Sequence, residues 1–117
     1  MNIEEFREYC IAKKGAIEET PFGPDTLVFK VMNKIFALTS LESEFFKVSL
    51  KCDPDKAIEL REEFDYIVPG FHLNKKHWNT VNGEIASTKK LKALIDHSFD
   101  MVTASFTKKQ KEEFALL

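Results

Sequence analysis

The sequence predicts an α+β fold: a two-layer domain with helices packed on one face of a mostly antiparallel sheet. Three observations predict it. Segments in which apolar and polar residues alternate follow one another in the first half of the chain, segments with helical apolar spacing flank them, and turn signals join them. With 117 residues, 44% of them hydrophobic and 31% charged, the chain is expected to form one globular domain over 1–117. Eleven phenylalanines against one tryptophan indicate a core built largely on phenylalanine.

The N-terminal segment is predicted to be a helix that starts after Asn2. Asn2 is a good N-cap residue, and Glu5 stands in the capping-box position three residues later. Ile3, Phe6 and Cys10 then share one face, and we expect the helix to stop at Gly15.

Three strands are predicted next. Pro21, Gly23 and Pro24 form a turn between two extended pieces, of which the second, Leu27 to Met32, alternates as a strand does. Asn33-Lys34 reads as a tight hairpin, and the sequence KIFALTS returns as the next strand. After the acidic turn LESE, the sequence FFKVSLK alternates clearly and predicts a third strand.

The second half is predicted to be mainly helical. Asp53 caps a helix with Pro54 in its first turn, and Ser87 or Thr88 opens the last long helix. The buried stripes are expected to be Ala57, Ile58, Leu60 and Phe64 in the first helix, and Leu91, Leu94, Ile95, Phe99, Val102 and Phe106 in the second. Between them, residues 66–76 are predicted as loop and 77–81 as a short strand before the Asn82-Gly83 turn. Thr107 with Gln110 opens a terminal helix in which Phe114 and Leu117 are expected to dock.

This arrangement predicts a basic strip on a chain whose net charge is −2. If helices cover the face of Phe46, Val48 and Leu50, the opposite face of the sheet stays exposed. The side chains expected there are Lys30, Lys47, Ser49 and Lys51, on neighbouring strands about 5 Å apart. A pI near 5.9 argues against a protein that coats nucleic acid non-specifically, but allows such a local patch.

The cellular compartment of the protein and the redox state of its cysteines are predicted from apolar content, N-terminal charge and cysteine spacing. No segment approaches the ~20 apolar residues of a membrane span, and the first residues are acidic where a signal peptide would be basic. We therefore expect a cytoplasmic protein with no membrane association. Cys10 and Cys52 are not in a CxxC spacing and are expected to be reduced, buried thiols.

Five ordered motifs resemble the MmcQ/YjbR family of small bacterial proteins. They are PFGPDTLVFKV, KIFAL, VSLKCDPDKAIELRE, PGFHLNKKHWNTV and LIDHSFDMV. The resemblance covers almost the whole chain, from about Glu4 to Phe106. The resemblance implies an α+β domain compared to a double-wing DNA-binding fold and similar in architecture to type III secretion chaperones. Its most characteristic motif corresponds here to Pro69, Gly70, His72, Asn74, Lys75, Lys76, His77, Trp78 and Asn79.

The segment NKKHW has two interpretations. In the functional one, Lys75 and Lys76 contact phosphate oxygens, the ring of His77 or Trp78 stacks on a sugar or base, and Asn74 donates to phosphate. Asn79 would read a base edge or phosphate in the same way. In the structural one, the tryptophan is a core residue and the lysines are simply solvated.

Other chemistries have little support in the sequence. The three histidines lack the spacing of a metal site, and we predict no metal and no cofactor. His97 is expected to hydrogen-bond a loop carbonyl. Cys52, before a helix N-cap, is expected to be unreactive because burial opposes the thiolate. Asp25 and Thr26 fit an ordinary turn, with a wing tip as the alternative.

Three functional hypotheses follow. The first is a non-enzymatic DNA-binding protein that contacts duplex phosphates through Lys30, Lys47 and the loop lysines. The second is a protein-interaction or chaperone-like adaptor that receives a partner segment. The third, an enzyme or small-ligand binder near His72, His77 and Trp78, requires a concave pocket that brings these rings together.

Overall fold

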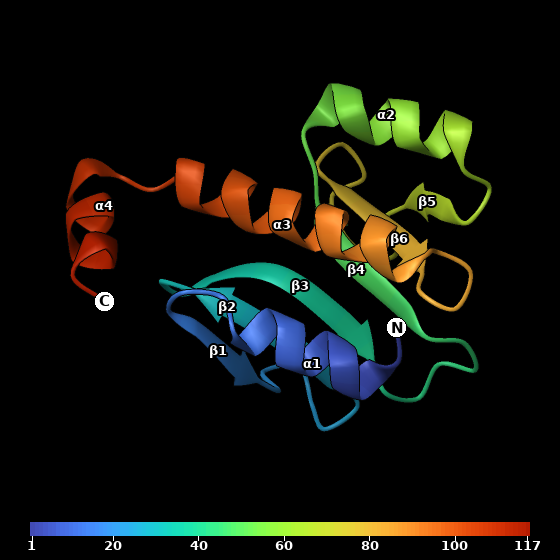
Figure 1. Ribbon diagram of the computed structural model, residues 1–117, viewed down its shortest axis with the longest axis horizontal. Coiled ribbons are helices and arrows are strands. Elements are labelled where there is room, and N and C mark those ends of the chain that lie inside the picture. Colours follow the sequence, from blue (N-terminus) through green and yellow to red (C-terminus); the bar gives the residue numbers. More distant parts are fainter.

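The computed structural model describes residues 1–117 and confirms the α+β fold (Figure 1). Its elements in chain order are α1 (Ile3–Ile11), β1 (Ala16–Glu19), β2 (Thr26–Val31), β3 (Lys34–Ser40), β4 (Lys47–Lys51), α2 (Pro54–Glu63), β5 (Ile67–Pro69), β6 (Trp78–Asn82), α3 (Thr88–Ala104) and α4 (Lys108–Ala115). The six strands form one sheet in the order β1-β2-β3-β4-β6-β5, and every neighbouring pair is antiparallel.

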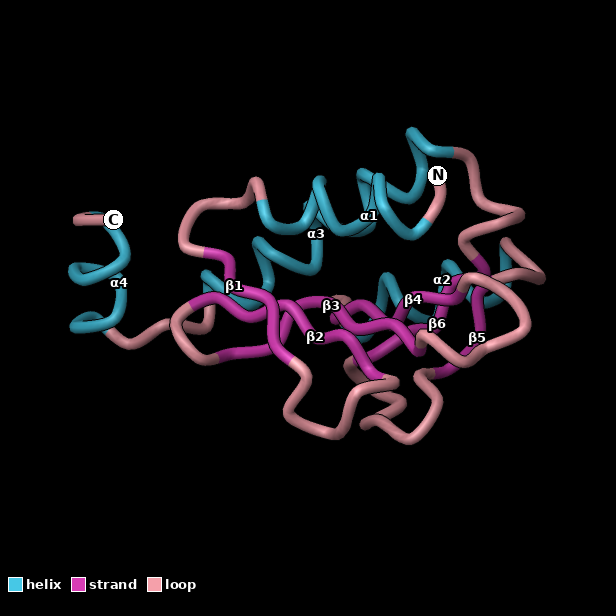
Figure 2. Tube along the Cα trace, turned by 90° about the horizontal axis from the view of Figure 1, so that it is seen from below, coloured by secondary structure: helices cyan, strands magenta, loops and turns pink.

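The sheet has a helical side and a loop side. Figure 2 shows α1 and α3 above the sheet, whereas the long connections lie below it. Helix α4 follows the C-terminal end of α3 (Figure 1), and its Phe114 packs on Phe99 and Phe106, as predicted. No helix is long and apolar enough to cross a membrane. One face of the sheet is thus left to the loops, as the alternation of the third predicted strand indicated.

Polar caps fix the helix starts, as predicted. Asn2 and Glu5 form the capping box of α1, Asp53 accepts the Lys56 N–H at the start of α2, and Ser87 caps α3. His97 differs from the prediction: its Nε2 does not meet a carbonyl but accepts the backbone N–H of Asp53 at 3.1 Å. Burial and the nearby Lys56 lower the pKa of His97, which favours the neutral ring that can accept this bond.

Phenylalanine rings hold the helical side together, as the composition predicted. Phe6 of α1 meets Phe29 of β2 edge-on at 5.5 Å, and Phe36 of β3 meets Phe99 of α3 at 5.3 Å. Phe36 is the extra residue of a bulge, because Phe29 pairs with Ala37 and Lys30 with Ile35. Phe36 and Ala37 are therefore both fully buried although they are consecutive.

Several local predictions are wrong. The hairpin turn is Met32-Asn33, one residue earlier than expected, with φ of 49° and 65°, a conformation that matches the twist of a two-residue hairpin. Helix α1 ends at Ile11, before Gly15. Ile58 is 52% exposed and Leu117 is 64% exposed. Strand β5 was predicted as loop, because three residues that end in proline give too weak a strand signal.

Candidate ligand-binding groove

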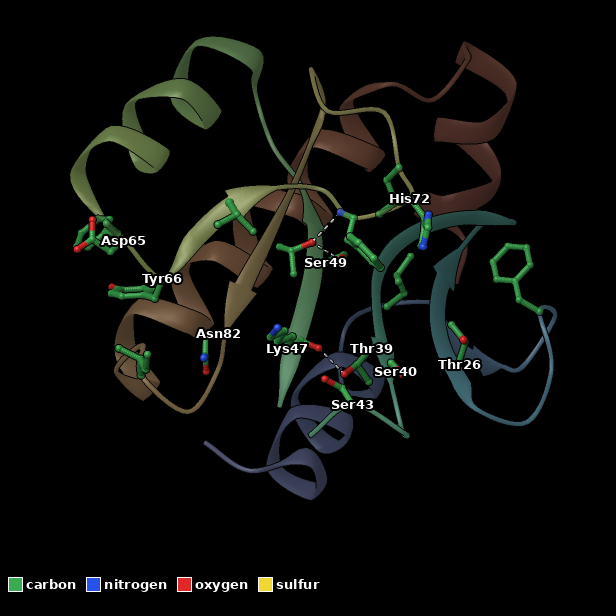
Figure 3. A pocket seen from close by; sticks show the side chains of 18 of the residues that line it. Thr26, Thr39, Ser40, Ser43, Lys47, Ser49, Asp65, Tyr66, His72 and Asn82 are labelled. Atoms are coloured by element: carbon green, nitrogen blue, oxygen red, sulfur yellow. Dashed lines mark hydrogen bonds between the residues drawn. The ribbon is translucent and has the colours of Figure 1, made fainter. Parts of the chain in front are cut away.

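A large groove occupies the loop side of the sheet (Figure 3). Its volume is about 1210 Å³, above the range of roughly 300–1,000 Å³ that is typical of small-molecule pockets. The lining comes from both halves of the chain and comprises Phe22, Thr26, Leu38, Thr39, Ser40, Ser43, Lys47, Ser49, Glu63, Phe64, Asp65, Tyr66, Val68, Phe71, His72, Leu73, Thr80, Asn82 and Ile85. A ligand in it would lie across several strands.

The floor of the groove is a cross-strand row. Leu38 of β3 pairs with Ser49 of β4, Ser49 with Thr80 of β6, and Thr80 with Val68 of β5. The hydroxyls of Ser49 and Thr80 hydrogen-bond to each other at 2.9 Å. Because these two hydroxyls are hydrogen-bonded to each other, the floor between Leu38 and Val68 is largely apolar.

One wall is the loop from Gly70 to His77, here called the 70–77 loop. It turns back over the sheet, and the Phe71 N–H donates to Thr80 Oγ1 at 3.1 Å. Only glycine fits at position 70, because a Cβ there would lie 2.7 Å from the Cβ of Trp78. His72 has a φ of 60°, which is uncommon for a residue other than glycine, and Figure 3 shows its ring beside the groove. Phe22, which lies in the turn before β2, also lines the groove.

The apolar side chains of the walls are unusually exposed. Phe71 is 70% exposed, Phe22 67%, Ile85 64% and Val68 48%. Apolar side chains that gather on one concave surface mark a binding site more often than a solvated surface. The groove therefore has the composition of a recognition site, with apolar contacts around a few polar groups.

The charge of the groove is mixed, with more acids than bases. Lys47 is its only lysine or arginine, whereas Glu63 and Asp65 both line it. Figure 3 shows Lys47 among the labelled side chains, with Asp65 and Tyr66 together at one side. The predicted basic strip is thus reduced to one lysine at this site.

The structure separates Lys30 from the other two lysines of the predicted strip, Lys47 and Lys51. Lys30 lies on β2, and Lys47 lies on β4, with β3 between them. The expectation that they occupy neighbouring strands is therefore wrong. Lys30 is ion-paired with Glu19 at 2.9 Å and its side chain is only 15% exposed, whereas Lys47 is exposed in the groove.

The NKKHW residues lie outside the groove lining. Asn74 Oδ1 accepts the N–H of Lys76, which closes a turn, and the ammonium of Lys75 donates to the Gly70 carbonyl at 3.1 Å. The carbonyl of His77 accepts the Cys52 N–H, and Trp78 is half-buried at the start of β6. Lys76 is exposed. The motif thus makes the turn that shapes the wall, and the rings of His72, His77 and Trp78 do not share one pocket.

Asn79 belongs to the opposite side of the sheet. It is 3% exposed, and its Oδ1 accepts the Nε–H of Arg61 at 2.6 Å. The guanidinium of Arg61 also donates to the carbonyls of Lys75 and Trp78. Asn79 is therefore a structural residue that joins β6 to α2, and Arg61 is the residue that ties down the end of the 70–77 loop.

The two cysteines are buried thiols, as predicted. Cys10 and Cys52 are free and buried. Burial raises the pKa of Cys10 to about 12 and also raises the pKa of Cys52, so both stay protonated thiols. No three His, Cys, Asp or Glu side chains are grouped as metal ligands.

Sequence reasoning missed the groove itself. Its walls depend on two turns in which phenylalanine neighbours glycine, at Phe22-Gly23 and Gly70-Phe71. A large aromatic residue in a turn has no place in the alternation of a strand or in the stripe of a helix. This was the one signal in the sequence that pointed to exposed apolar surface.

Comparisons with known proteins agree on one family. A family model described as YjbR matches residues 11–101. The chain is 39% identical over 93 residues to the uncharacterized protein YbdF of Escherichia coli O157:H7, covering 79% of this chain and 76% of that protein. It is 37% identical over 81 residues to the uncharacterized protein YjbR of Escherichia coli K12, covering 69% of each.

Solved structures show the same fold. The crystal structure of Deinococcus radiodurans protein DR2400, with the domain DUF419, is similar at a TM-score of 0.89 and 36% identity, over 97% of this chain and 88% of that chain. A crystal structure of a protein from Pseudomonas syringae is similar at a TM-score of 0.74 and 28% identity, over 86% of this chain and 98% of that chain.

Proposed function

The chain belongs to the YjbR family, and we propose that it is a non-enzymatic binding protein whose groove receives an apolar segment of a partner protein. The observation that carries this proposal is the groove of about 1210 Å³ whose walls expose Phe22, Phe71, Val68 and Ile85. This is the adaptor hypothesis, with the groove as the surface that receives the partner segment.

The polar groups of the groove support binding rather than catalysis. Ser49 and Thr80 are engaged with one another, and Thr39 Oγ1 donates to the Lys47 carbonyl at 2.6 Å. Nucleophilic catalysis would need such a hydroxyl to be hydrogen-bonded to a base. Here these three hydroxyls instead fix the positions of the strands, and the exposed side chains of the walls are apolar.

Removing the two exposed wall rings should abolish binding of an apolar probe. We expect the double substitution Phe22→Ser/Phe71→Ser to weaken binding of the neutral dye Nile red roughly tenfold or more, because most of the accessible aromatic surface of the groove is lost. Fluorescence titration of the full chain measures the affinity.

The matched control is Leu116→Ser/Leu117→Ser. These residues are 87% and 64% exposed but follow α4, away from the groove lining. The control should bind Nile red as the unmodified chain does. Equal loss of dye binding in both double variants, or none in either, would show that the groove is not the apolar binding site.

DNA binding is the second candidate. It is favoured by the loop side of the sheet being free of helices and by the exposure of Lys47 and Lys76. In this proposal, the phosphates of a DNA duplex contact four lysines of the chain: Lys30, Lys47, Lys75 and Lys76. Lys30 would first have to leave Glu19, and Lys75 would have to leave the Gly70 carbonyl. We therefore place this function second.

The DNA proposal makes a clear prediction about salt. Four phosphate contacts give a log–log slope of affinity against salt of roughly −3 to −4. In a fluorescence-anisotropy titration with a labelled duplex, Lys75→Glu/Lys76→Glu should lower this slope and weaken binding. If binding at low salt is weak and the double variant leaves it unchanged, the DNA proposal is wrong.

A further inference from the structure

The charge of the groove indicates the chemistry of its occupant. Resting on the proposed function, we propose that the partner segment is cationic and amphipathic, with lysine or arginine side chains next to apolar ones. The apolar side chains would contact the walls at Phe22 and Phe71, and a cationic group would meet Glu63 and Asp65.

The two carboxylates are available to a ligand. Glu63 and Asp65 are both exposed, and the three ion pairs of the structure, Arg7–Glu18, Lys13–Asp96 and Lys30–Glu19, all lie elsewhere. A cation that reaches them would therefore form new pairs rather than displace a lysine or arginine of the chain itself. A charge-assisted hydrogen bond to a carboxylate is roughly twice as strong as a neutral one.

Aromatic rings lie between and beside these carboxylates. Phe64 and Tyr66 alternate with Glu63 and Asp65 along the chain, and the two rings pack at 5.1 Å. The ammonium of Lys90 lies 4.6 Å from the centre of the Phe64 ring. One face of the Phe64 ring therefore already holds a cation of the chain itself, and the groups left for the cation of a ligand are the carboxylates of Glu63 and Asp65, which form no ion pair with a lysine or arginine.

Acidic residues next to the groove lining also favour a cationic ligand. Glu42 and Glu44 flank the lining residue Ser43, and Glu84 precedes the lining residue Ile85. All three glutamates are exposed. Since Lys47 is the only opposing lysine or arginine in the lining, the groove attracts cations and repels a polyanion. Charge complementarity therefore favours a basic peptide over a nucleic acid.

Two probe peptides test the inference. They have equal length and carry a fluorescein label; one alternates lysine with leucine, and the other alternates glutamate with leucine. We expect the unmodified full chain to bind the lysine peptide about tenfold more tightly or better. Glu63→Gln/Asp65→Asn should weaken binding of the lysine peptide several-fold.

The matched control is Glu112→Gln/Glu113→Gln. It makes the same change in net charge on exposed residues of α4, outside the groove, and should leave the affinity for the lysine peptide unchanged. The inference is overturned if the glutamate peptide or a labelled DNA duplex binds as tightly as the lysine peptide. It is also overturned if both double variants weaken peptide binding equally.

These outcomes separate the inference from the proposed function. If Nile red binding still depends on Phe22 and Phe71, but the chain binds the lysine peptide no more tightly than the glutamate peptide, the groove binds an apolar segment that is not cationic. If Nile red binding does not depend on these two rings, the proposed function fails first.

Discussion

Replacing Phe36 with alanine should lower the free energy of unfolding by about 3–5 kcal/mol. The ring is fully buried in the bulge of β3, and it packs against Phe29 at 6.4 Å and Phe99 at 5.3 Å. Truncation removes one of the contacts between the sheet and α3, and it leaves a cavity at the bulge. Since domains are stable by only about 5–15 kcal/mol, urea unfolding followed by circular dichroism should show a large fall in the midpoint.

The control for this prediction is an exposed ring of the same type. Phe71 is 70% exposed, so Phe71→Ala should change stability by about 0.5 kcal/mol or less. If Phe36→Ala does not fold, Phe36→Leu provides the measurable loss, which should be smaller because most of the volume remains. Equal midpoints for Phe36→Ala and Phe71→Ala would contradict the placement of Phe36 in the core.

The sequence was sufficient for the elements whose signals are local. The caps at Asn2, Asp53, Ser87 and Thr107 lie within a few residues of the groups that they bond, so each helix start was predictable. The alternation in 45–51 likewise predicted that Val48 and Leu50 are core residues, but Ser49, which was expected on the exposed face, is only 6% exposed. Strand β5 was not predicted, because its three residues are held by pairing with β6 rather than by their own propensity.

The groove could not be predicted, because it depends on long-range placement. Lys30 and Lys47 lie on the same face of the sheet, as the alternation predicted, but the strand order puts β3 between them. Glu19 of the edge strand β1 also neutralises the charge of Lys30. Glu63 and Asp65 reach the same surface from the end of α2, which no spacing in the sequence indicates. An expected basic strip thus becomes an apolar groove with an acidic side.

The NKKHW motif illustrates how a characteristic sequence can serve structure. The side chains of Asn74 and Lys75 hydrogen-bond to the loop's own backbone. Its tryptophan carbonyl accepts the Gly70 N–H at 2.8 Å. The wall that carries Phe71 and His72 therefore has a fixed shape, and the residue that holds it from outside is Arg61. Stability and binding should be coupled through that residue.

Replacing Arg61 with methionine should both destabilise the chain and loosen the groove wall. The substitution keeps an apolar stem but removes the donors to Asn79 Oδ1 and to the Lys75 and Trp78 carbonyls. Asn79 is 3% exposed, so its oxygen would be left buried without this partner, at a cost of about 1–3 kcal/mol. Urea unfolding measures this loss, and hydrogen exchange should show faster exchange of the amides in the 70–77 loop.

Arg7→Met is the control that separates a positioning role from a loss of charge. Arg7 forms a two-point ion pair with Glu18 at 2.6 Å and 3.0 Å, but this pair is solvent-exposed, so its loss should affect stability far less.

The Arg61→Met variant should also bind Nile red more weakly, because Phe71 is no longer held over Thr80, whereas Arg7→Met should bind it normally. If Arg61→Met keeps both slow exchange in the loop and full dye affinity, the wall is held by the sheet alone. Arg61→Lys should recover little of the loss, because an ammonium cannot match the fork of donors that reaches a side-chain oxygen and two carbonyls together.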